Sequence, residues 1–386
     1  MTPQGANTLR TIELPYGRGT RRVSLPDDAS VVQLPTAPEP RALAPLLDAA
    51  LANPFGARAL EPVDRVTIIV SDASRHEPRA ELVAAVLRRV GDAAVTLAIA
   101  NGTHRPGDPS ELGLSPALLS AATVVNHDAN DAARLVQVGT TARGTALRVN
   151  RCLVEADLVV ATGRIKPHYF AGFGAGAKAL FPGLGANDDV RVNHRLKTAP
   201  GSRAGVVDGN PCREDLEEIV DALACETHLL NVVTDGNGGA QAAVAGDLRA
   251  AFRRGAAACA PLFTVDAPSV ACIVIADELP LTASLYQASK LVAAAAPKLL
   301  PGGHIVLVAA CPDGPGPIDV INRGIYDIGL APRLPDEHTV HLVSTLPREV
   351  VEQTYCRYAP SVESVLEQVD GAVLVLPRGG DMLWAQ

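Results

Sequence analysis

The sequence predicts an α/β protein of two domains, each with a largely parallel sheet flanked by helices. Short runs rich in Val and Ile alternate with stretches rich in Ala, Leu and Glu, which is the pattern of strands alternating with helices. The 386 residues suffice for two domains of ordinary size. Hydrophobic residues make up 47% of the chain but aromatic residues only 3%, so both cores must be built from small aliphatic side chains.

The individual elements follow from these runs in chain order. We expect strands at residues 66–70, 95–100, 158–161, 229–233, 271–276, 304–309, 339–343 and 372–376. We expect helices at residues 41–52, 79–90, 215–224, 247–259, 285–300 and 362–369. In the last of these, Val362, Val365 and Leu366 fall on one helical face.

A domain boundary is expected near residues 261–268 (PLFTVDAP), where two prolines flank a short connector. Residues 1–262 then form an amino-terminal cofactor-binding domain and residues 268–370 a carboxy-terminal α/β domain. We expect residues 371–386 to form a strand and tail that return to the amino-terminal domain. The active site is predicted in the cleft between the domains.

Charge and composition exclude several classes of protein. The net charge of −8 disfavours a nucleic-acid partner, because nucleic-acid binders present a basic face. No apolar stretch has the length of a signal-peptide core or a membrane span. The seven cysteines form no CxxC pair and suggest a reducing compartment. We therefore expect a cytoplasmic protein without a membrane partner, and a homo-oligomer stays open.

Three polar motifs each follow a predicted strand: SDASR at residues 71–75, NGTHR at 101–105 and TGRIKPH at 162–168. The carboxyl ends of parallel strands meet at one edge of a sheet, where ligands bind, so these loops should converge. Taken singly, Asp72 reads as a helix cap, Arg75 as a surface charge and His104 as a turn residue. Convergence favours a functional reading of Asp72, Arg75, His104 and His168 over the structural one.

A glycine-rich turn with one lysine follows the third motif, in the stretch PHYFAGFGAGAKALFPGLGANDDVRVNH (residues 167–194). Gly172, Gly174 and Gly176 allow close approach of a ligand to the backbone. The turn is neither a P-loop nor a dinucleotide fingerprint, because the spacing of its glycines and lysine fits neither pattern. Lys178 could form a Schiff base. Spacing alone does not make His194 a metal ligand.

These residues resemble the nickel-dependent lactate racemase family, whose members are racemases and epimerases of 2-hydroxy acids. The similarity rests on SDASR, NGTHR, the NHD turn at residues 126–128, GRIKPHYFAGFGAGAK, the Pro-Gly pair at 182–183 and VNH at 192–194, and it extends to LYQASK at 285–290. So many motifs in one order make chance similarity improbable.

The resemblance implies a nickel-pincer nucleotide (nickel pyridinium-3,5-bisthiocarboxylic acid mononucleotide), attached covalently to Lys178 and bound near the three glycines and Asp72. His194 would ligate the nickel, and His104 and His168 would be the acid/base pair. Arg75, Gln287 and Lys290 would bind the substrate. The nucleotide is made by separate maturation proteins, which would be partners of this chain.

The implied reaction inverts C2 of a 2-hydroxy acid by reversible hydride transfer to the cofactor. The α-hydrogen is a poor acid, whereas removing hydride leaves a planar keto acid that accepts hydride on either face. Family members that act on lactate carry a tryptophan near the substrate, where this chain has EQTYCRY (residues 352–358). We therefore expect a substrate bulkier than lactate. The alternatives are a lysine Schiff-base enzyme of the pyridoxal-phosphate type, a non-catalytic small-molecule-binding homologue and, last, a zinc hydrolase.

Overall fold

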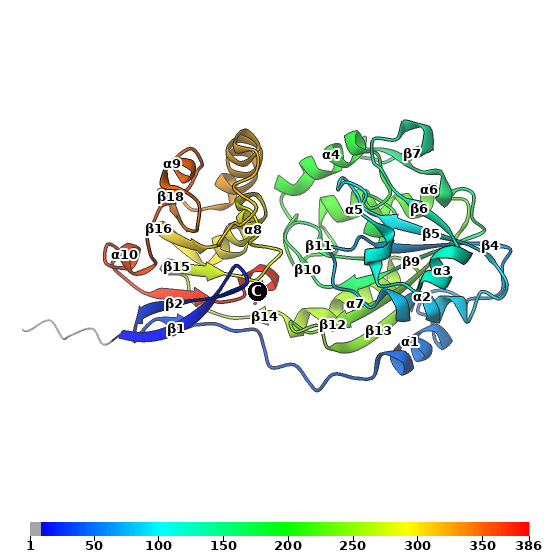
Figure 1. Cartoon of the computed structure of the whole chain (residues 1–386), viewed down its shortest axis with the longest axis horizontal. Helices are drawn as coiled ribbons and strands as arrows, with labels where there is room; N and C mark the ends of the chain where they lie inside the picture. Colours follow the sequence, from blue (N-terminus) through cyan, green and yellow to red (C-terminus); the bar gives the residue numbers. More distant parts are fainter. Residues whose placement is uncertain (1–8, 386) are drawn as a thin grey trace, which may run out of the picture. The chain divides into compact units, whose positions relative to one another are not determined.

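The structure is a computed structural model that describes residues 9–385. The chain divides into two compact units. One, here called the continuous unit, spans residues 36–262, and the other, here called the split unit, combines described residues 9–35 with 263–385. Figure 1 shows the elements of both units.

The continuous unit is organised around a six-stranded sheet in the order β13-β12-β9-β4-β5-β6, in which only β13 runs antiparallel to its neighbour. Its strands are β4 (Arg65–Ser71), β5 (Ala94–Ala100), β6 (Thr123–Asn126), β7 (Leu135–Thr140), β8 (Ala146–Asn150), β9 (Leu158–Ile165), β10 (Pro167–His168), β11 (Gly172–Phe173), β12 (Glu226–Thr234) and β13 (Ala240–Gly246). Its helices are α1 (Leu43–Ala52), α2 (Arg79–Leu87), α3 (Pro116–Ala121), α4 (Asn187–Arg195), α5 (Pro211–Glu217), α6 (Ile219–Ala222) and α7 (Ala250–Cys259).

Helices cover both faces of this sheet. Leu47 of α1 and Val83 of α2 pack on the face that carries Ile68, Val160 and Leu230. On the opposite face α7 approaches so closely that a Cβ at Gly255 would lie 2.3 Å from Ile165 Cδ1. Because both faces are buried, the central strands are apolar throughout instead of alternating.

The strand order creates a switch point at β4. The chain runs from β4 through β5 to β6 on one side, then continues with β9 and β12 on the other side. In open α/β sheets such a point is the usual place for a ligand, beyond the carboxyl ends of the strands. The loops after β4, β5 and β9 all leave from this end.

The split unit has a six-stranded parallel sheet in the order β18-β17-β16-β15-β19-β3. Its strands are β1 (Leu9–Tyr16), β2 (Gly19–Pro26), β3 (Ser30–Val31), β14 (Thr264–Val265), β15 (Val270–Ala276), β16 (Leu299–Val308), β17 (Thr339–Val343), β18 (Arg357–Tyr358), β19 (Val373–Leu376) and β20 (Leu383–Trp384). Its helices are α8 (Leu285–Ala295), α9 (Arg348–Val351), α10 (Glu363–Leu366) and a π-helix at Val320–Leu330.

Alternate residues of this sheet enter two cores. Ile273, Ile305 and Leu374 pack with α8 on one face. Val274 and Val306 pack on the other face with the β1–β2 hairpin. The predicted α/β fold with largely parallel sheets is confirmed.

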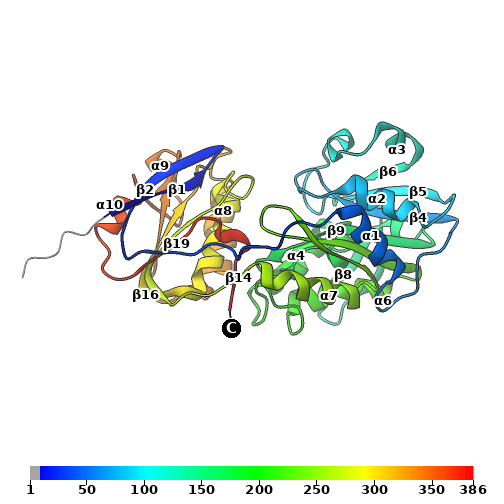
Figure 2. The ribbon, with the colours of Figure 1, turned by 90° about the horizontal axis from the view of Figure 1, so that it is seen from below.

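The unit boundaries correct the predicted ones at both ends of the chain. The start of the chain does not belong with residues up to 262, because β3 pairs with β19 of the split unit. The tail at 371–386 does not return to the amino-terminal domain: β19 pairs with β15, and β20 pairs with β14. Figure 2 shows the extended stretch, in dark blue, that follows β3 and leads to α1.

The predicted helices are shorter in the structure or, for residues 215–224, divided between α5 and α6, and two of them are shortened most. The helix expected at 285–300 ends at Ala295, and Pro297 begins the turn that leads into β16. The helix expected at 362–369 is reduced to α10.

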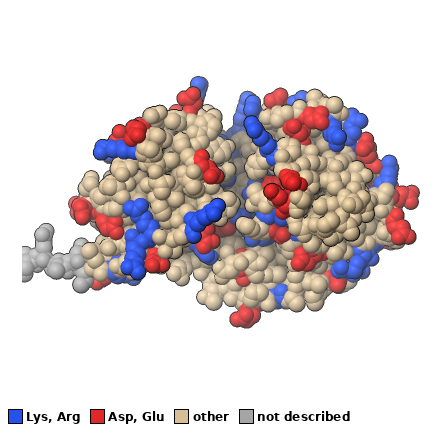
Figure 3. Space-filling view, viewed as in Figure 1, with Lys and Arg blue, Asp and Glu red and all other residues tan. Residues whose placement is uncertain are grey.

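The surface has no dominant sign of charge on the face drawn in Figure 3, where basic and acidic side chains are interspersed among wide uncharged areas of each unit. Within residues 9–385, the structure contains no helix of the length and apolarity that crossing a bilayer requires.

Candidate functional site

The polar residues after β4 and β5 form one cluster. His104 Nδ1 lies 3.3 Å from Asp72 Oδ2, and Arg75 Nε lies 3.9 Å from the same oxygen. Ser74 donates its backbone N–H to Asp72 Oδ1 at 2.8 Å. The side chains of His104 and Arg75 are 50% and 53% exposed, whereas that of Asp72 is 14% exposed. The carboxylate is therefore the most buried member of the cluster, and the imidazole and the guanidinium are half exposed.

This environment keeps Asp72 ionised. Burial by itself would raise the pKa of the carboxyl, but hydrogen bonds from His104 and Ser74 and the charge of Arg75 outweigh burial and lower the pKa to about 2. A carboxylate that accepts from Nδ1 holds the proton of a neutral imidazole on that nitrogen. Nε2 of His104 is then the nitrogen that can accept a proton.

Arg79 fixes the backbone of the loop that carries Asp72 and Arg75. This largely buried side chain, at the start of α2, donates to the Ser71 carbonyl at 2.9 Å and to the carbonyls of Asp72 and Arg75. Burial lowers the pKa of Arg79. One guanidinium therefore fixes three backbone carbonyls of the loop, and these hydrogen bonds do not use the side chains of Asp72 and Arg75.

The loop after β5 is tied to the segment that carries Lys178. The Gly102 N–H donates to the Gly183 carbonyl at 2.8 Å, and the Gly183 N–H donates to the Lys178 carbonyl at 2.9 Å. A Cβ at Gly183 would lie only 2.9 Å from the Cβ of Ala100. The segments that carry His104 and Lys178 therefore pack directly against each other.

The glycine loop before Lys178 requires glycine at two of its three predicted positions. Gly172 has φ +75° and a Cβ there would lie 2.0 Å from the Val206 carbonyl oxygen, while Gly176 has φ +66° and a Cβ there would lie 2.7 Å from Phe252. At Gly174 the nearest atom would be 3.7 Å away, an ordinary contact. Packing therefore requires glycine at positions 172 and 176, whereas at Gly174 there is room for a side chain beside the backbone.

Ala175 stands between these glycines with φ +65° and ψ −160°. This region of conformational space is essentially restricted to glycine, and a side chain there costs about 1–3 kcal/mol. Such a conformation persists only where surrounding contacts impose it.

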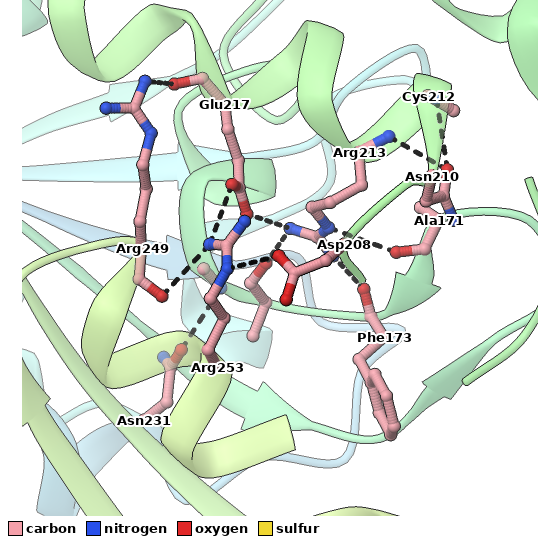
Figure 4. Close-up of polar contacts among 12 residues, drawn as sticks. Ala171, Phe173, Asp208, Asn210, Cys212, Arg213, Glu217, Asn231, Arg249 and Arg253 are labelled. Atoms are coloured by element: carbon pink, nitrogen blue, oxygen red, sulfur yellow. Dashed lines mark hydrogen bonds and ion pairs between the residues drawn. The ribbon is translucent and has the colours of Figure 1, made fainter. Parts of the chain in front are cut away.

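Arg213 supplies contacts of that kind. Its side chain is completely buried, and Nε donates to the Ala171 carbonyl at 3.1 Å, Nη2 to the Phe173 carbonyl and Nη1 to the Ala175 carbonyl at 3.4 Å (Figure 4). The guanidinium also lies 4.2 Å from the centre of the Phe252 ring.

A second cluster surrounds Phe170, which lies between two of the predicted histidines. Its ring makes edge-to-face contacts with His168 at 4.6 Å and with His194 at 5.0 Å between ring centres. The Ala171 N–H donates to His168 Nδ1 at 3.2 Å, which places the proton of the neutral ring on Nε2. His168 and His104 are therefore held in opposite tautomers.

His194, at the end of α4, has an unusual environment. Its Nδ1 atom is buried and has no hydrogen-bond partner among residues 9–385. Burial lowers the pKa of His194 to about 3, and the nearby charges of Lys178 and Lys197 contribute to the decrease. The imidazole is neutral at physiological pH, which is the form that binds a metal ion.

The Val190 backbone, one turn earlier in α4, opposes the decrease in the pKa of His194, but Nδ1 has no partner at normal hydrogen-bond geometry within the described chain. A buried polar atom in this position is costly, so it can gain from a bound ligand. In the described part of the chain, no three His, Cys, Asp or Glu side chains are grouped so that they could hold a metal ion. A metal at His194 would need its other ligands from a bound group. The residues therefore fit a cofactor that brings its own metal ligands and is anchored beside this imidazole.

Gln287 and Lys290, the other predicted substrate residues, lie on α8 of the split unit. Lys290 Nζ donates to Gln287 Oε1 at 2.5 Å, so the amide and the ammonium group form one polar pair. The predicted position of the site between the domains stays a prediction.

Sequence reasoning missed Arg79, Phe170 and Arg213. For Arg213, the sequence does indicate the start of its helix: Asn210 and Pro211 are typical of an N-cap and a first helical position. The Asn210 side chain accepts from the N–H groups of Cys212 and Arg213. Nothing in the local sequence indicates that the arginine itself is buried, because its partners lie about 40 positions earlier.

The sequence and the fold of this chain are similar to those of known proteins. The family described as lactate racemase N-terminal domain matches residues 16–205. The lactate racemase of Lactiplantibacillus plantarum is 30% identical over 324 residues, which cover 79% of this chain and 76% of that protein. The lactate racemase of Thermoanaerobacterium thermosaccharolyticum is 28% identical over 374 residues, which cover 88% of this chain and 86% of that protein. The solved structure of the apoprotein of that racemase is similar with a TM-score of 0.87 and 25% identity, covering 98% of this chain and 100% of the solved chain.

Proposed function

The chain belongs to the lactate racemase family, and from that premise we propose that it inverts C2 of a 2-hydroxy acid with a nickel-pincer nucleotide bound at Lys178 and His194. The enzyme is an isomerase of the racemase class. The observation that carries the cofactor proposal is the buried, neutral imidazole of His194, whose Nδ1 lacks a partner within the described chain and lies within the electrostatic influence of Lys178.

Lys178 would hold the nucleotide through its amine, and His194 would ligate the nickel. Gly174 leaves open backbone beside them, and Gly172 and Gly176 shape the loop. Asp72 is the most buried member of the adjoining cluster. When bound, the group supplies an acceptor and donor of hydride at a fixed position.

The chain's own contribution is proton transfer and orientation. His104, with its Nδ1 proton held by Asp72, is set to take the hydroxyl proton of the substrate at Nε2. His168 presents the N–H of Nε2, which can donate a hydrogen bond to the same class of oxygen. Inversion in the opposite direction requires the two rings to exchange roles, and for His168 this means giving up the contact with Ala171.

Arg75 would hold the substrate carboxylate, since a guanidinium binds a carboxylate through two parallel hydrogen bonds. Its half-exposed position and its distance of 3.9 Å from Asp72 leave donors for an incoming anion. We assign Gln287 and Lys290 to the substrate as well, on the strength of the family resemblance.

We propose a substrate bulkier than lactate. The tryptophan of the chain, Trp384, lies on β20, where its indole N–H donates to the Ala294 carbonyl at 2.7 Å. In the 352–358 region Tyr355 is stacked on Tyr326 with ring centres 4.5 Å apart, and its hydroxyl lies 2.8 Å from Ser289 Oγ. Packing of Tyr355 on neighbours of its own unit supports a site with more room than one bordered by an indole.

The test is intact mass and metal analysis of protein co-expressed with the maturation proteins, followed by assay of a panel of enantiopure 2-hydroxy acids. We expect one sulfur-containing mononucleotide adduct and one nickel per chain, with inversion of a larger acid faster than that of lactate. A borohydride-reducible aldimine without nickel would indicate the Schiff-base alternative. Clear preference for lactate would refute the proposed substrate.

A further inference from the structure

We propose that Arg213 is a positioning residue that holds the loop of residues 171–175 in the shape that presents Lys178 to the cofactor. This inference rests on the proposed function for the identity of the group at Lys178. It adds a residue that touches neither substrate nor cofactor, and acts through the backbone of the loop.

The first argument is the choice of partners that Arg213 makes. A completely buried guanidinium would ordinarily be paired with a carboxylate in a two-point contact. Here its nearest carboxylate, Glu217, lies 3.8 Å from Nη1, while the hydrogen bonds go to the carbonyls of Ala171, Phe173 and Ala175. Every second carbonyl of the loop therefore points at one side chain.

The second argument is the strained conformation of Ala175. A residue other than glycine keeps a positive φ only where its surroundings impose it. The Ala175 carbonyl is held by Nη1 of Arg213, and the next peptide N–H, that of Gly176, donates to Asn231 Oδ1 at 3.2 Å. Two side chains thus hold the peptide group that precedes the turn carrying Lys178.

The third argument is that the charge of Arg213 is balanced without occupying its donors. Glu217 supplies the opposite charge but is engaged by Arg253, whose Nη1 lies 3.0 Å from Glu217 Oε2. Arg253 also pairs with Asp208 at 2.7 Å (Figure 4). Arg253 therefore contacts the two carboxylates, Glu217 and Asp208, whereas Arg213 contacts the carbonyls of the loop.

Arg213 also lies close to the lysine in question. The charges of Lys178 and Arg213 both act on Cys212, opposing the increase in the pKa of this thiol that burial causes. From the same helix start, Asn210 Nδ2 donates to the Phe170 carbonyl at 2.8 Å. The amino end of α5 therefore holds both the Phe170 cluster and the glycine loop.

The test compares Arg213→Lys with Arg249→Gln as the matched control, because Arg249 pairs with Asp221 and with the backbone carbonyl of Glu217, and its removal keeps the pair between Glu217 and Arg253. A lysine keeps the charge but cannot reach three carbonyls with a planar fork. In the apoprotein, we expect hydrogen exchange of the amides at 172–178 to become about tenfold faster in Arg213→Lys, because these amides then open locally. Arg249→Gln should leave the loop amides unchanged relative to the rest of the unit.

Two further measurements complete the test. Adding Ala175→Gly to Arg213→Lys should restore slow exchange in part, since glycine removes the strain that Arg213 opposes. After co-expression with the maturation proteins, intact mass should show an adduct fraction about tenfold lower in Arg213→Lys than in wild type, because attachment requires a positioned amine.

The inference fails if loop exchange in Arg213→Lys equals that of wild type, or if it rises evenly across the continuous unit as it would for a general loss of stability. It also fails if the adduct fraction is unchanged. Absence of any adduct in wild type would overturn the proposed function instead, and the exchange pattern of the apoprotein would still decide whether Arg213 holds the loop.

Discussion

The loops after β4 and β9 are each held by one buried arginine, yet they present opposite kinds of side chain. Arg79 binds three carbonyls beneath Asp72 and Arg75, and Arg213 binds three carbonyls of the glycine loop before Lys178. Above Arg79 the polar groups are about half exposed. In the environment of Lys178, which follows the second loop, His194 has a buried Nδ1 and is neutral.

The difference indicates what each loop is suited to bind. At the first loop, Arg75 and His104 are half exposed and paired with the ionised Asp72, so a ligand can replace the water around them and leave again. A buried imidazole nitrogen without a well-placed partner gains free energy when a bound group supplies one. The same kind of backbone support is thus found beneath the loop proposed to bind the substrate and beside the loop proposed to bind the cofactor.

The largest expected effect comes from removing the amine of Lys178, which follows the glycine loop. Lys178→Ala should abolish the covalent adduct, because no other amine is presented by the turn at residues 176–179. Intact mass after co-expression measures this directly, and racemase activity should fall below detection. Lys197→Ala is the control, since Lys197 also acts on the charge state of His194 but is not the predicted attachment point. An adduct that persists in Lys178→Ala would contradict the assignment.

Next in size is the loss of either histidine. His104→Ala and His168→Ala should keep the adduct and lower kcat by about 10²–10⁴-fold, the usual contribution of a positioned acid or base. His76→Ala, which removes an exposed histidine near the first loop, should leave kcat within about twofold. The assignment would be wrong if His76→Ala and His104→Ala had equal effects.

Two glycines of the second loop should respond differently to substitution, because glycine is required by the backbone at Gly172 but not at Gly174. Gly172→Ala should lower the free energy of unfolding by about 2–4 kcal/mol, because its Cβ would collide with the Val206 carbonyl at a positive φ. Gly174→Ala should change this free energy by less than about 1 kcal/mol, since its contacts are ordinary. Urea unfolding measures both, and equal losses would show that the loop conformation differs from the one described.

The smallest effect concerns the pH dependence of the first loop. The folded-state pKa of Asp72 is lowered to about 2, so its stabilising contribution is present above the unfolded pKa of ~3.9 and disappears as the pH falls toward 2. Allowing for solvent screening, wild type should exceed Asp72→Asn by about 1 kcal/mol at about pH 6. Urea unfolding between about pH 6 and about pH 2 should show this difference shrinking, and a constant difference would contradict the pairing with His104 and Arg75.

Much of the fold was predictable because sheets covered on both faces give continuous apolar runs, as in β4, β9 and β15. The β1–β2 hairpin was not predicted: much of its sequence is exposed or partly buried, and its partners lie near the other end of the chain. The two residues of β3 carry no strand signal of their own and are fixed only by pairing with β19.

The candidate site was predictable where a residue type reveals its chemistry. Asp72, Arg75, His104 and His168 were expected to meet because parallel strands end together. The first three do, whereas His168 packs on Phe170, and its convergence with the other three stays a prediction. The burial of Arg213 was not predictable, since an arginine is usually exposed and its acceptors are carbonyls, which every residue has. The role of Phe170 likewise depends on distances between His168 and His194 that spacing does not determine.

The division of the chain also bears on the order in which the protein can fold as it is synthesised. Everything from α1 to α7, including the lysine and the imidazole proposed to hold the nucleotide, is encoded without interruption. The hairpin and β3 emerge from the ribosome before the continuous unit, but β3 cannot pair until β19, which follows that unit, has been synthesised. The continuous unit, proposed to bind the cofactor, can thus complete its fold while the split unit is still incomplete.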